Sequence, residues 1–221
     1  MTAVDVRLNA IVDPERSGGH DLADLARTLA EGGATLIQLR DKKSDTGVML
    51  ERARAIKAAL KPLGVPLVIN DRVDVALAMG ADGVHVGQTD MPVEIARRML
   101  GRDAIIGLSI KSVALAEAAP IELLDYVGVG GVYATTSKDN PNPPIGLDGL
   151  ARIAAVFGRR APRFPLCAIA GIDAGNAAAA IRAGAHGVAV ISALSLAPDP
   201  TAAARELRAV VDAALAERVS A

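Results

Sequence analysis

Residues 67–90 read LVINDRVDVALAMGADGVHVGQTD, and this stretch decides the fold. Two apolar runs, typical of buried strands, are separated by a short helical segment and a glycine turn. Asn70 and Asp71 follow the first run, and Asp90 follows the second. Because the carboxyl ends of parallel strands open onto one face, we expect Asp71 and Asp90 to meet over one site.

Two carboxylates that converge beside basic residues favour a hard cation such as Mg²⁺, bound partly through substrate phosphates. The alternative is that Asp71 and Asp90 each cap the helix that follows their strand. Taken singly, neither aspartate distinguishes a metal ligand from a helix cap.

The composition excludes several classes of protein. Among 221 residues, 24 Lys and Arg balance 25 Asp and Glu to a net charge of −1, so there is no basic excess for nucleic acid. Aromatic residues make up 2% of the chain, which leaves no stacking platform for single strands. Hydrophobic residues reach 51%, but they form short runs and none approaches a membrane span. We therefore expect no nucleic acid and no membrane as partner.

The cysteine content favours the cytoplasm. Cys167 is the single cysteine, which excludes an internal disulfide and fits a reducing compartment. It lies in the apolar run PLCAIA, where an inert core thiol is expected rather than a nucleophile. The first residues, MTAVDVRLNAIVDPE, lack a basic leader and are unlike a signal peptide.

Strand and helix patterns alternate along the whole chain. The expected strands are residues 6–13, 34–40, 66–70, 83–86, 104–109, 125–130, 165–170 and 187–192. The expected helices are residues 20–30, a segment from Ser44 or Asp45 to Pro62, the short segment inside 67–90, a helix opened by Pro92, residues 113–119, residues 147–157, a helix capped by Asp173 that reaches 183, and a last helix from about Thr201.

This alternation predicts a (β/α)8 TIM barrel, with residues 1–221 as a single domain and the active site at the carboxyl ends of the strands. A repeated Gly-Ala pair at 33–34, 80–81 and 184–185 supports the count, because glycine ends a helix in a left-handed turn. The runner-up is an open doubly wound sheet, since sequence shows strand order only indirectly. Eight strand–helix units in 221 residues favour a sheet that closes into a barrel.

Polar residues gather where the second and fifth strands end. Gln38 and Arg40 alternate within one strand, so both side chains should point to the same side, and Lys42 follows them. Ser109 ends the fifth strand. A solvated charge run is the commoner fate of such lysines and arginines, but a glutamine and an arginine on one side of an apolar strand end require a partner.

The longest loop, GGVYATTSKDNPNPPIG, follows the sixth strand and holds Thr135, Thr136, Ser137 and Lys138. Hydroxyls followed by a lysine suit phosphate binding, and a loop of this length is usually functional or disordered. A second place for phosphate is expected where the loops after strands seven and eight meet. Those loops contribute Gly171, Ile191 and Ser192.

The collected residues comprise two acids, several bases and hydroxyls, with no cysteine and no evident Ser-His pairing. Chemistry that uses a metal and a diphosphate but no protein nucleophile is the departure of pyrophosphate from a carbon centre. His85 lies within the fourth strand, and we expect a hydrogen-bonded structural role for it rather than that of a general base.

These residues resemble the thiamine-phosphate synthase family over nearly the whole chain. The motifs that carry the resemblance are IQLRDKK, LVINDR, GADGVHVGQTD, DYVGVGGVYATTSK followed by PPIGLDGL, AIAGI and VAVISAL. The resemblance implies a transferase that condenses 4-amino-2-methylpyrimidin-5-ylmethyl diphosphate with a thiazole ethyl phosphate, in which a carboxylated thiazole is also conceivable. The products are thiamine phosphate and pyrophosphate, and the diphosphate is thought to leave first.

The resemblance also implies roles for individual residues, with Lys138, Arg40 and Ser109 closest to the chemistry. The implied contacts to the pyrimidine diphosphate are Gln38, Arg40, Lys42, Asn70, Ser109 and Lys138. The implied Mg²⁺ ligands are Asp71 and Asp90. The implied thiazole-phosphate site consists of Thr135, Thr136, Ser137, Gly171, Ile191 and Ser192.

Two departures from the family pattern stand out. The loop usually reads Phe-Pro-Thr-x-Thr-Lys, whereas here it begins Tyr133-Ala134 and keeps a hydroxyl at Ser137. Ala134 removes a fixed φ angle, which predicts a more mobile loop. The usual Gly-Gly before Ile is Ala170-Gly171 here. If a phosphate oxygen packs against residue 170, the affinity for the thiazole is expected to drop.

Two other functions are compatible with the sequence. A related thiazole tautomerase would share the fold and phosphate site but would not need Asp71, Asp90 and Lys138 together. A non-catalytic protein that binds a phosphorylated heterocycle would leave the acidic pair idle. In each case the partners are small phosphorylated molecules. The oligomeric state is not set by these patterns, which are compatible with a homo-oligomer.

Overall fold

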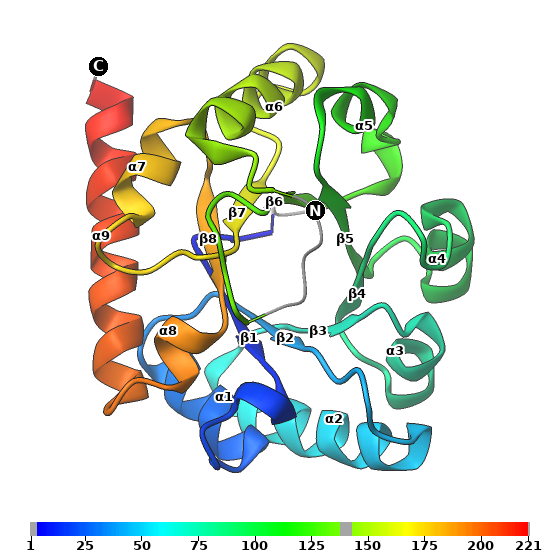
Figure 1. The fold of residues 1–221 in the computed structure, drawn as a ribbon. Helices are drawn as coiled ribbons and strands as arrows, with labels where there is room; N and C mark the ends of the chain where they lie inside the picture. The colour runs from blue at the N-terminus through cyan, green and yellow to red at the C-terminus, as the bar shows by residue number, and fades with distance from the viewer. Residues whose placement is uncertain (1–3, 138–142, 221) are drawn as a thin grey trace.

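Eight parallel strands close into a barrel in the computed structural model, which describes residues 4–137 and 143–220 (Figure 1). The strands are β1 (Leu8–Val12), β2 (Leu36–Leu39), β3 (Leu67–Asn70), β4 (Gly83–Val86), β5 (Ile105–Ile110), β6 (Tyr126–Gly130), β7 (Leu166–Ile169) and β8 (Gly187–Val190). Each strand pairs with the next, and β1 pairs with β8 through Asn9 and Ala189. The predicted (β/α)8 barrel is therefore confirmed, and the open sheet is excluded.

Helices surround the strands on the outside of the barrel (Figure 1). They are α1 (Leu22–Glu31), α2 (Thr46–Leu60), α3 (Val73–Met79), α4 (Val93–Leu100), α5 (Val113–Ala118), α6 (Gly146–Arg160), α7 (Ala177–Arg182), α8 (Ser192–Ser195) and α9 (Pro200–Ser220). Three short 3-10 turns are η1 (Pro14–Arg16), η2 (Lys61–Leu63) and η3 (Ile121–Leu123).

Two details of the helices differ from the sequence prediction. The four-residue helix α8 follows β8 directly and was not expected, since its single turn is too short for a periodic apolar pattern. The predicted cap at Asp173 lies one turn too early. Its carboxylate accepts hydrogen bonds from the backbone N–H groups of Gly175 and Asn176, and α7 begins only at Ala177.

The strands are buried on both faces, which explains their almost uninterrupted apolar sequences. One large apolar cluster lies between the barrel and the helices, and it includes Ile37, Ile69 and Val127. A smaller cluster fills the interior of the barrel, where Leu36, Val68 and Tyr126 pack together. The interior is thus a second core, and it supports the residues at the carboxyl ends of the strands.

The repeated Gly-Ala pairs act as the sequence predicted. Gly33, Gly80 and Gly184 have φ angles of +108°, +64° and +111°, in the region that glycine adopts without a steric penalty. Each ends a helix and turns the chain back into the barrel.

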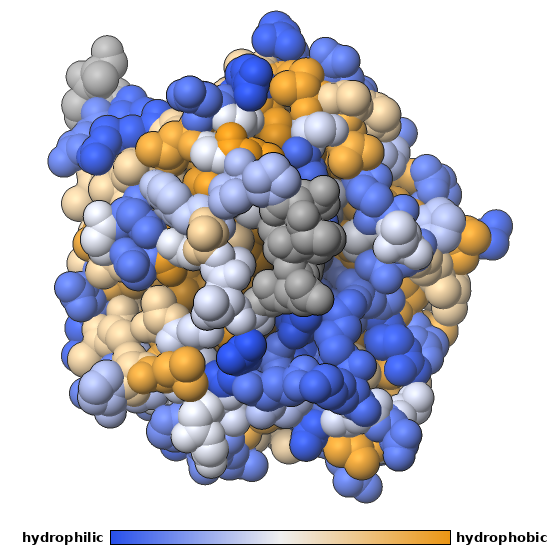
Figure 2. All heavy atoms as spheres, in the orientation of Figure 1, coloured by the Kyte–Doolittle hydropathy of each residue, from blue (hydrophilic) through white to orange (hydrophobic). Residues whose placement is uncertain are grey.

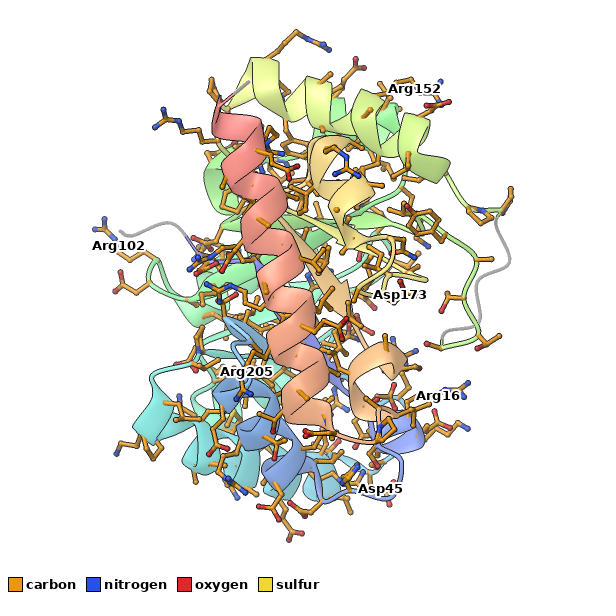
Figure 3. All side chains as sticks on the ribbon, turned by 90° about the vertical axis from the view of Figure 1, so that its left-hand side faces the viewer. Arg16, Asp45, Arg102, Arg152, Asp173 and Arg205 are labelled. Carbon is orange, nitrogen blue, oxygen red and sulfur yellow. The ribbon has the colours of Figure 1, made fainter. Side chains whose placement is uncertain are left out.

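The carboxyl ends of the strands form one end of the barrel. Figure 3 shows Arg16 and Asp173, which follow β1 and β7, at this end, whereas Arg102, which precedes β5, lies at the other. Figure 2 looks onto this end and shows hydrophilic residues gathered over the loops after β1, β2 and β3. In the described part of the chain, no helix combines the length and apolar character needed to cross a membrane.

Candidate active site

A cavity of about 500 Å³ opens at the carboxyl ends of the strands. Ten of the residues singled out from the sequence line it together: Gln38, Arg40, Asn70, Ser109, Thr135, Thr136, Ser137, Gly171, Ile191 and Ser192. Gln38 and Arg40 both face the cavity, as their alternation on β2 predicted. Lys138 lies outside the residues that the structure describes.

The guanidinium of Arg40 is held by an acid that the sequence did not point to. Its Nη1 donates to the carboxylate of Asp13, at the end of β1. The Asp13 side chain is only 1% exposed and that of Arg40 is 15% exposed, so the ion pair is largely shielded from water. The other Asp13 oxygen accepts the backbone N–H of Glu15 at 2.9 Å. Asp13 therefore orients Arg40 at the edge of the cavity.

Asp71, Asp90 and Lys42 form a second polar cluster beside the cavity. Asn70, which precedes Asp71, lines the cavity, whereas these three do not. The Lys42 ammonium contacts the Asp71 carboxylate, and the Asp90 carboxyl group lies within hydrogen-bonding reach of Asp71. Burial, together with Asp90, raises the pKa of Asp71, although Lys42 acts in the opposite direction. The two aspartates therefore lie next to each other, as expected, and their role as metal ligands stays a prediction.

The backbone of Asp71 shows that this position is demanding. Its φ angle is +63°, a left-handed conformation that non-glycine residues seldom adopt. The conformation is stabilised by a 2.8 Å hydrogen bond from its N–H to the carbonyl of His85. Neither aspartate serves as a helix cap, because the positions before α3 and α4 are taken by Arg72 and Pro92.

The acidic pair fits a magnesium ion. Two anionic carboxylates in contact repel each other, and a divalent cation between them removes that repulsion. Asp90 is oriented by the N–H of Gly87, which donates to its Oδ2 at 2.8 Å. Among the described residues, no group of three or more His, Cys, Asp or Glu side chains is arranged to hold a metal. A pair of carboxylates suits Mg²⁺, which commonly binds one or two carboxylates and completes its shell with water and phosphate.

Hydroxyl groups from the loop after β6 and from the start of α8 meet at the wall of the cavity. The hydroxyls of Ser137 and Ser192 lie 2.6 Å apart, although 55 residues separate them. The N–H of Ser137 donates to Oγ1 of Thr135 at 3.1 Å, which folds the loop back on itself. Arg16 fastens the loop by donating to the carbonyl of Thr136 at 2.8 Å. These contacts bring the two expected phosphate places together in one site.

The Ala170-Gly171 departure has a clear structural setting. Both residues have positive φ angles, +85° at Ala170 and +64° at Gly171. A Cβ atom at Gly171 would approach the carbonyl oxygen of Ala134 to 2.4 Å, so only glycine fits there. Ala170 adopts a conformation in which glycine is strain-free and alanine costs about 1–2 kcal/mol. The alanine therefore adds backbone strain next to the cavity.

His85 is hydrogen-bonded through both ring nitrogens, and its contact with Ser109 is a Ser-His pairing that the sequence did not reveal. Nδ1 lies 2.9 Å from the hydroxyl of Tyr126, and Nε2 lies 2.9 Å from Oγ of Ser109. Cys167 is fully buried, and burial raises the pKa of its thiol, which agrees with an inert core cysteine.

Sequence reasoning missed several residues of this site. Asp13 ends β1 in the same way that Asp71 follows β3, and this parallel was an available signal. Asn9 was also available, because it is the one polar residue within the strand LNAIV. Tyr126 carried no signal, since an aromatic residue at the start of a strand is ordinary core.

Comparisons with known proteins place this chain among close relatives. A family model described as thiamine monophosphate synthase matches residues 8–194. The chain is 50% identical to a thiamine-phosphate synthase of Agrobacterium fabrum, with 99% of each chain covered. It is 47% identical to one of Albidiferax ferrireducens, with 96% of each covered. Among solved structures, thiamine phosphate pyrophosphorylase of Pyrococcus furiosus is similar, with a TM-score of 0.82, 35% identity and coverage of 96% and 98%.

The buried Arg40–Asp13 pair should matter for stability. Replacing Asp13→Ala leaves a shielded guanidinium without its partner, and we expect a loss of about 3–5 kcal/mol in the free energy of unfolding. The matched control is Asp74→Ala, which removes an exposed partner of Arg72 and should cost less than about 1 kcal/mol. Urea denaturation measures both, and equal losses would show that burial of the first pair is unimportant.

Proposed function

Because this chain belongs to the thiamine monophosphate synthase family and is a transferase of that type, we propose a specific condensation for it. The substrates are 4-amino-2-methylpyrimidin-5-ylmethyl diphosphate and 4-methyl-5-(2-phosphoethyl)thiazole. The products are thiamine phosphate and pyrophosphate. A carboxylated thiazole belongs to the same proposal as an alternative second substrate.

One observation carries this proposal. A single cavity is lined both by basic and amide side chains at the ends of β2 and β3 and by the hydroxyl cluster of Ser137 and Ser192. A site for one phosphorylated heterocycle needs only one of these groups. Two such groups in one cavity suit two phosphorylated substrates that must meet.

The proposed reaction makes and breaks the following bonds. The carbon–oxygen bond of the pyrimidinylmethyl diphosphate breaks, and the diphosphate leaves with the electron pair. The thiazole nitrogen then donates its lone pair to the resulting cation and forms the new carbon–nitrogen bond. Arg40, already oriented by Asp13, stabilises negative charge as it develops on the leaving group. Lys42 and Lys138 are proposed to act on the same group, while Gln38 and Asn70 hold the pyrimidine end and Ser109 donates a hydrogen bond.

Asp71 and Asp90 are the proposed ligands of Mg²⁺. When bound, the ion would neutralise charge on the diphosphate oxygens. Lys42 already contacts Asp71, so the same lysine can move between the carboxylate and a diphosphate oxygen. Asp71 follows Asn70, which lines the cavity, and this supports the assignment of the acids to the diphosphate end.

The thiazole phosphate is assigned to the other side. Thr135, Thr136 and Ser137 supply hydroxyl and backbone donors from the loop after β6. Gly171, Ile191 and Ser192 supply backbone and hydroxyl donors from the ends of β7 and β8. Location in the cytoplasm stays a prediction from the cysteine content, and a homo-oligomer stays compatible with the sequence.

The test of the proposal is purified protein with both substrates and Mg²⁺, assayed for thiamine phosphate and pyrophosphate. Formation of both products in equal amounts supports the synthase. Interconversion of thiazole isomers without pyrophosphate would identify the tautomerase instead. Tight binding of the heterocycles without turnover would identify the non-catalytic binding protein.

Activity should depend on a divalent metal. We expect excess chelator to abolish turnover and added Mg²⁺ to restore it, because Asp71 and Asp90 converge on one cation. Asp71→Asn should raise the Mg²⁺ concentration needed for half-maximal rate. Asp74→Asn, three residues away and exposed, is the matched control and should leave that concentration unchanged. Full turnover in chelator would remove the metal from the mechanism.

Ser192 should act on the thiazole substrate. We expect Ser192→Ala to raise KM for the thiazole phosphate more than KM for the pyrimidine diphosphate, because the serine lies with Ser137 on the thiazole side. Steady-state kinetics with each substrate varied in turn provides the comparison. An equal or reversed effect would mean that the two substrate sites have been exchanged in the assignment.

Lys138 should increase the rate at which the carbon–oxygen bond to the diphosphate breaks. Loss of a contact that strengthens as the diphosphate departs should cost about 2–4 kcal/mol, or roughly 30- to 1000-fold in turnover. Lys138→Ala should fold normally and still bind the thiazole phosphate, and Lys138→Arg should rescue only partly because its planar fork is a different donor. Lys61→Ala, in η2, is the control for simple loss of a lysine. Turnover of Lys138→Ala within about threefold of the parent at saturating substrates would make the lysine a bystander.

A further inference from the structure

Four polar side chains from four strands form a chain of contacts inside the barrel. The amide of Asn9, on β1, hydrogen-bonds the hydroxyl of Tyr126, on β6. That hydroxyl lies 2.9 Å from Nδ1 of His85, on β4, and Nε2 of His85 lies 2.9 Å from Oγ of Ser109, on β5. All four residues line the lower part of the cavity, and Ser109, the least buried of them, ends the chain.

The space for this chain is provided by glycines. A Cβ atom at Gly107 would approach the Tyr126 ring to 2.3 Å and Nδ1 of His85 to 2.5 Å. A Cβ at Gly128 would approach Cε1 of His85 to 3.0 Å. The ring centroids of His85 and Tyr126 lie 5.3 Å apart, with their planes tilted by 38°. The two rings are fixed by close packing as well as by their hydrogen bond.

The direction of each hydrogen bond follows from the donors available. Burial raises the pKa of Tyr126 well above its ordinary value, so the phenol keeps its proton. The hydrogen bond from Asn9 has the opposite influence on this pKa, as expected of an N–H donor, and Oδ1 of Asn9 is buried without a partner. With the Asn9 amide donating, as its influence on this pKa indicates, Nδ1 of His85 is left as the acceptor for the Tyr126 hydroxyl, because a buried O–H without an acceptor is costly.

Matching donors to acceptors in the same way gives the direction of the hydrogen bond between His85 and Ser109. A neutral imidazole that accepts at Nδ1 carries its proton on Nε2, and this N–H donates to Oγ of Ser109. The Ser109 hydroxyl then accepts from His85 and keeps its own proton for another partner. The backbone carbonyl of Ser109 is already bonded to Nε2 of Gln88 at 2.8 Å, which holds the residue in place.

We propose that Tyr126 is a positioning residue that acts through His85 to turn the Ser109 hydroxyl proton into the cavity, where it donates to the pyrimidine diphosphate. The substrate contact of Ser109 rests on the proposed function. In the reverse direction, Ser109 would donate to His85 and present only lone pairs to an anionic substrate. A donor aimed at the substrate attracts the growing negative charge, whereas lone pairs repel it.

The first test reads the proton on His85 without any substrate. The chain contains only three histidines, so ¹⁵N NMR of labelled histidine rings, with His85→Gln for assignment, identifies the ring nitrogen that bears the proton. We expect the proton on Nε2 in the parent, and a mixture of both tautomers in Tyr126→Phe. A proton held on Nδ1 in the parent would overturn the proposal, whatever the enzyme catalyses.

The second test is a double-mutant cycle of Tyr126→Phe and Ser109→Ala. Tyr126→Phe keeps the ring and should lower kcat about tenfold, with KM for both substrates within about twofold of the parent. In the Ser109→Ala background the same change should alter kcat less than about twofold, because the tyrosine acts only through the serine. An equal loss in both backgrounds, or no loss in either, would overturn the proposal.

Val68→Ala is the matched control, since this buried residue packs in the same interior cluster as Tyr126 but neither lines the cavity nor belongs to the hydrogen-bonded chain. This control variant should leave the proton on Nε2 of His85, and it should not alter the effect of Ser109→Ala on kcat. Thermal unfolding of each variant shows whether it is folded. If the parent makes no thiamine phosphate, the proposed function fails, while the NMR measurement still decides the proton direction.

Discussion

The hydrogen-bonded pairing of β1 with β8 is the contact on which the rest of the molecule depends. It joins the first and last strands through Leu8 and Val188, Asn9 and Ala189, and Ala10 and Val190. Closure removes both sheet edges and turns alternate side chains of every strand into one shared interior. It also brings distant segments together, as when the Ser195 hydroxyl donates to the Arg16 carbonyl at 2.6 Å across 179 residues. Helix α9 packs against both α1 and α7, and so covers the closing strands from outside (Figure 1).

The fold was predictable because each of its units carries a local signal. Apolar runs of strand length, glycine turns and helix periodicity recur in order, and the left-handed Gly80 ends α3 as its sequence context indicated. The composition of the cavity was predictable for the same reason, since polar residues after parallel strands must meet. The residues that pair with these polar side chains were harder to predict from the sequence. Asp13 and Arg40 are 27 positions apart, and only the closed barrel shows that β1 and β2 present them to each other. The short helix α8 is fixed by tertiary contacts rather than by its own four residues.

The site is organised by charge pairing at its edge and by hydrogen bonds at its base. At the edge, Arg40 is paired with Asp13 and Lys42 with Asp71, so these two basic groups are held near the cavity by acids. At the base, neutral donors and acceptors replace ions, as expected where water is excluded and charge is expensive. This division puts the ionic groups in the part of the site that is proposed to bind phosphate. The neutral base is left to fix direction.

The close approach of the Gly107 backbone to the rings of Tyr126 and His85 also limits how such a barrel can diverge. A side chain at position 107 and a large ring at position 126 cannot occupy the same volume, so these positions must change together or not at all. Among distant relatives we expect compensated pairs: a smaller residue at 126 accompanied by a side chain at 107. A lineage that took this route would keep its barrel but lose its buried hydroxyl. We therefore expect substitutions at positions 107 and 126 to be correlated among members of the family.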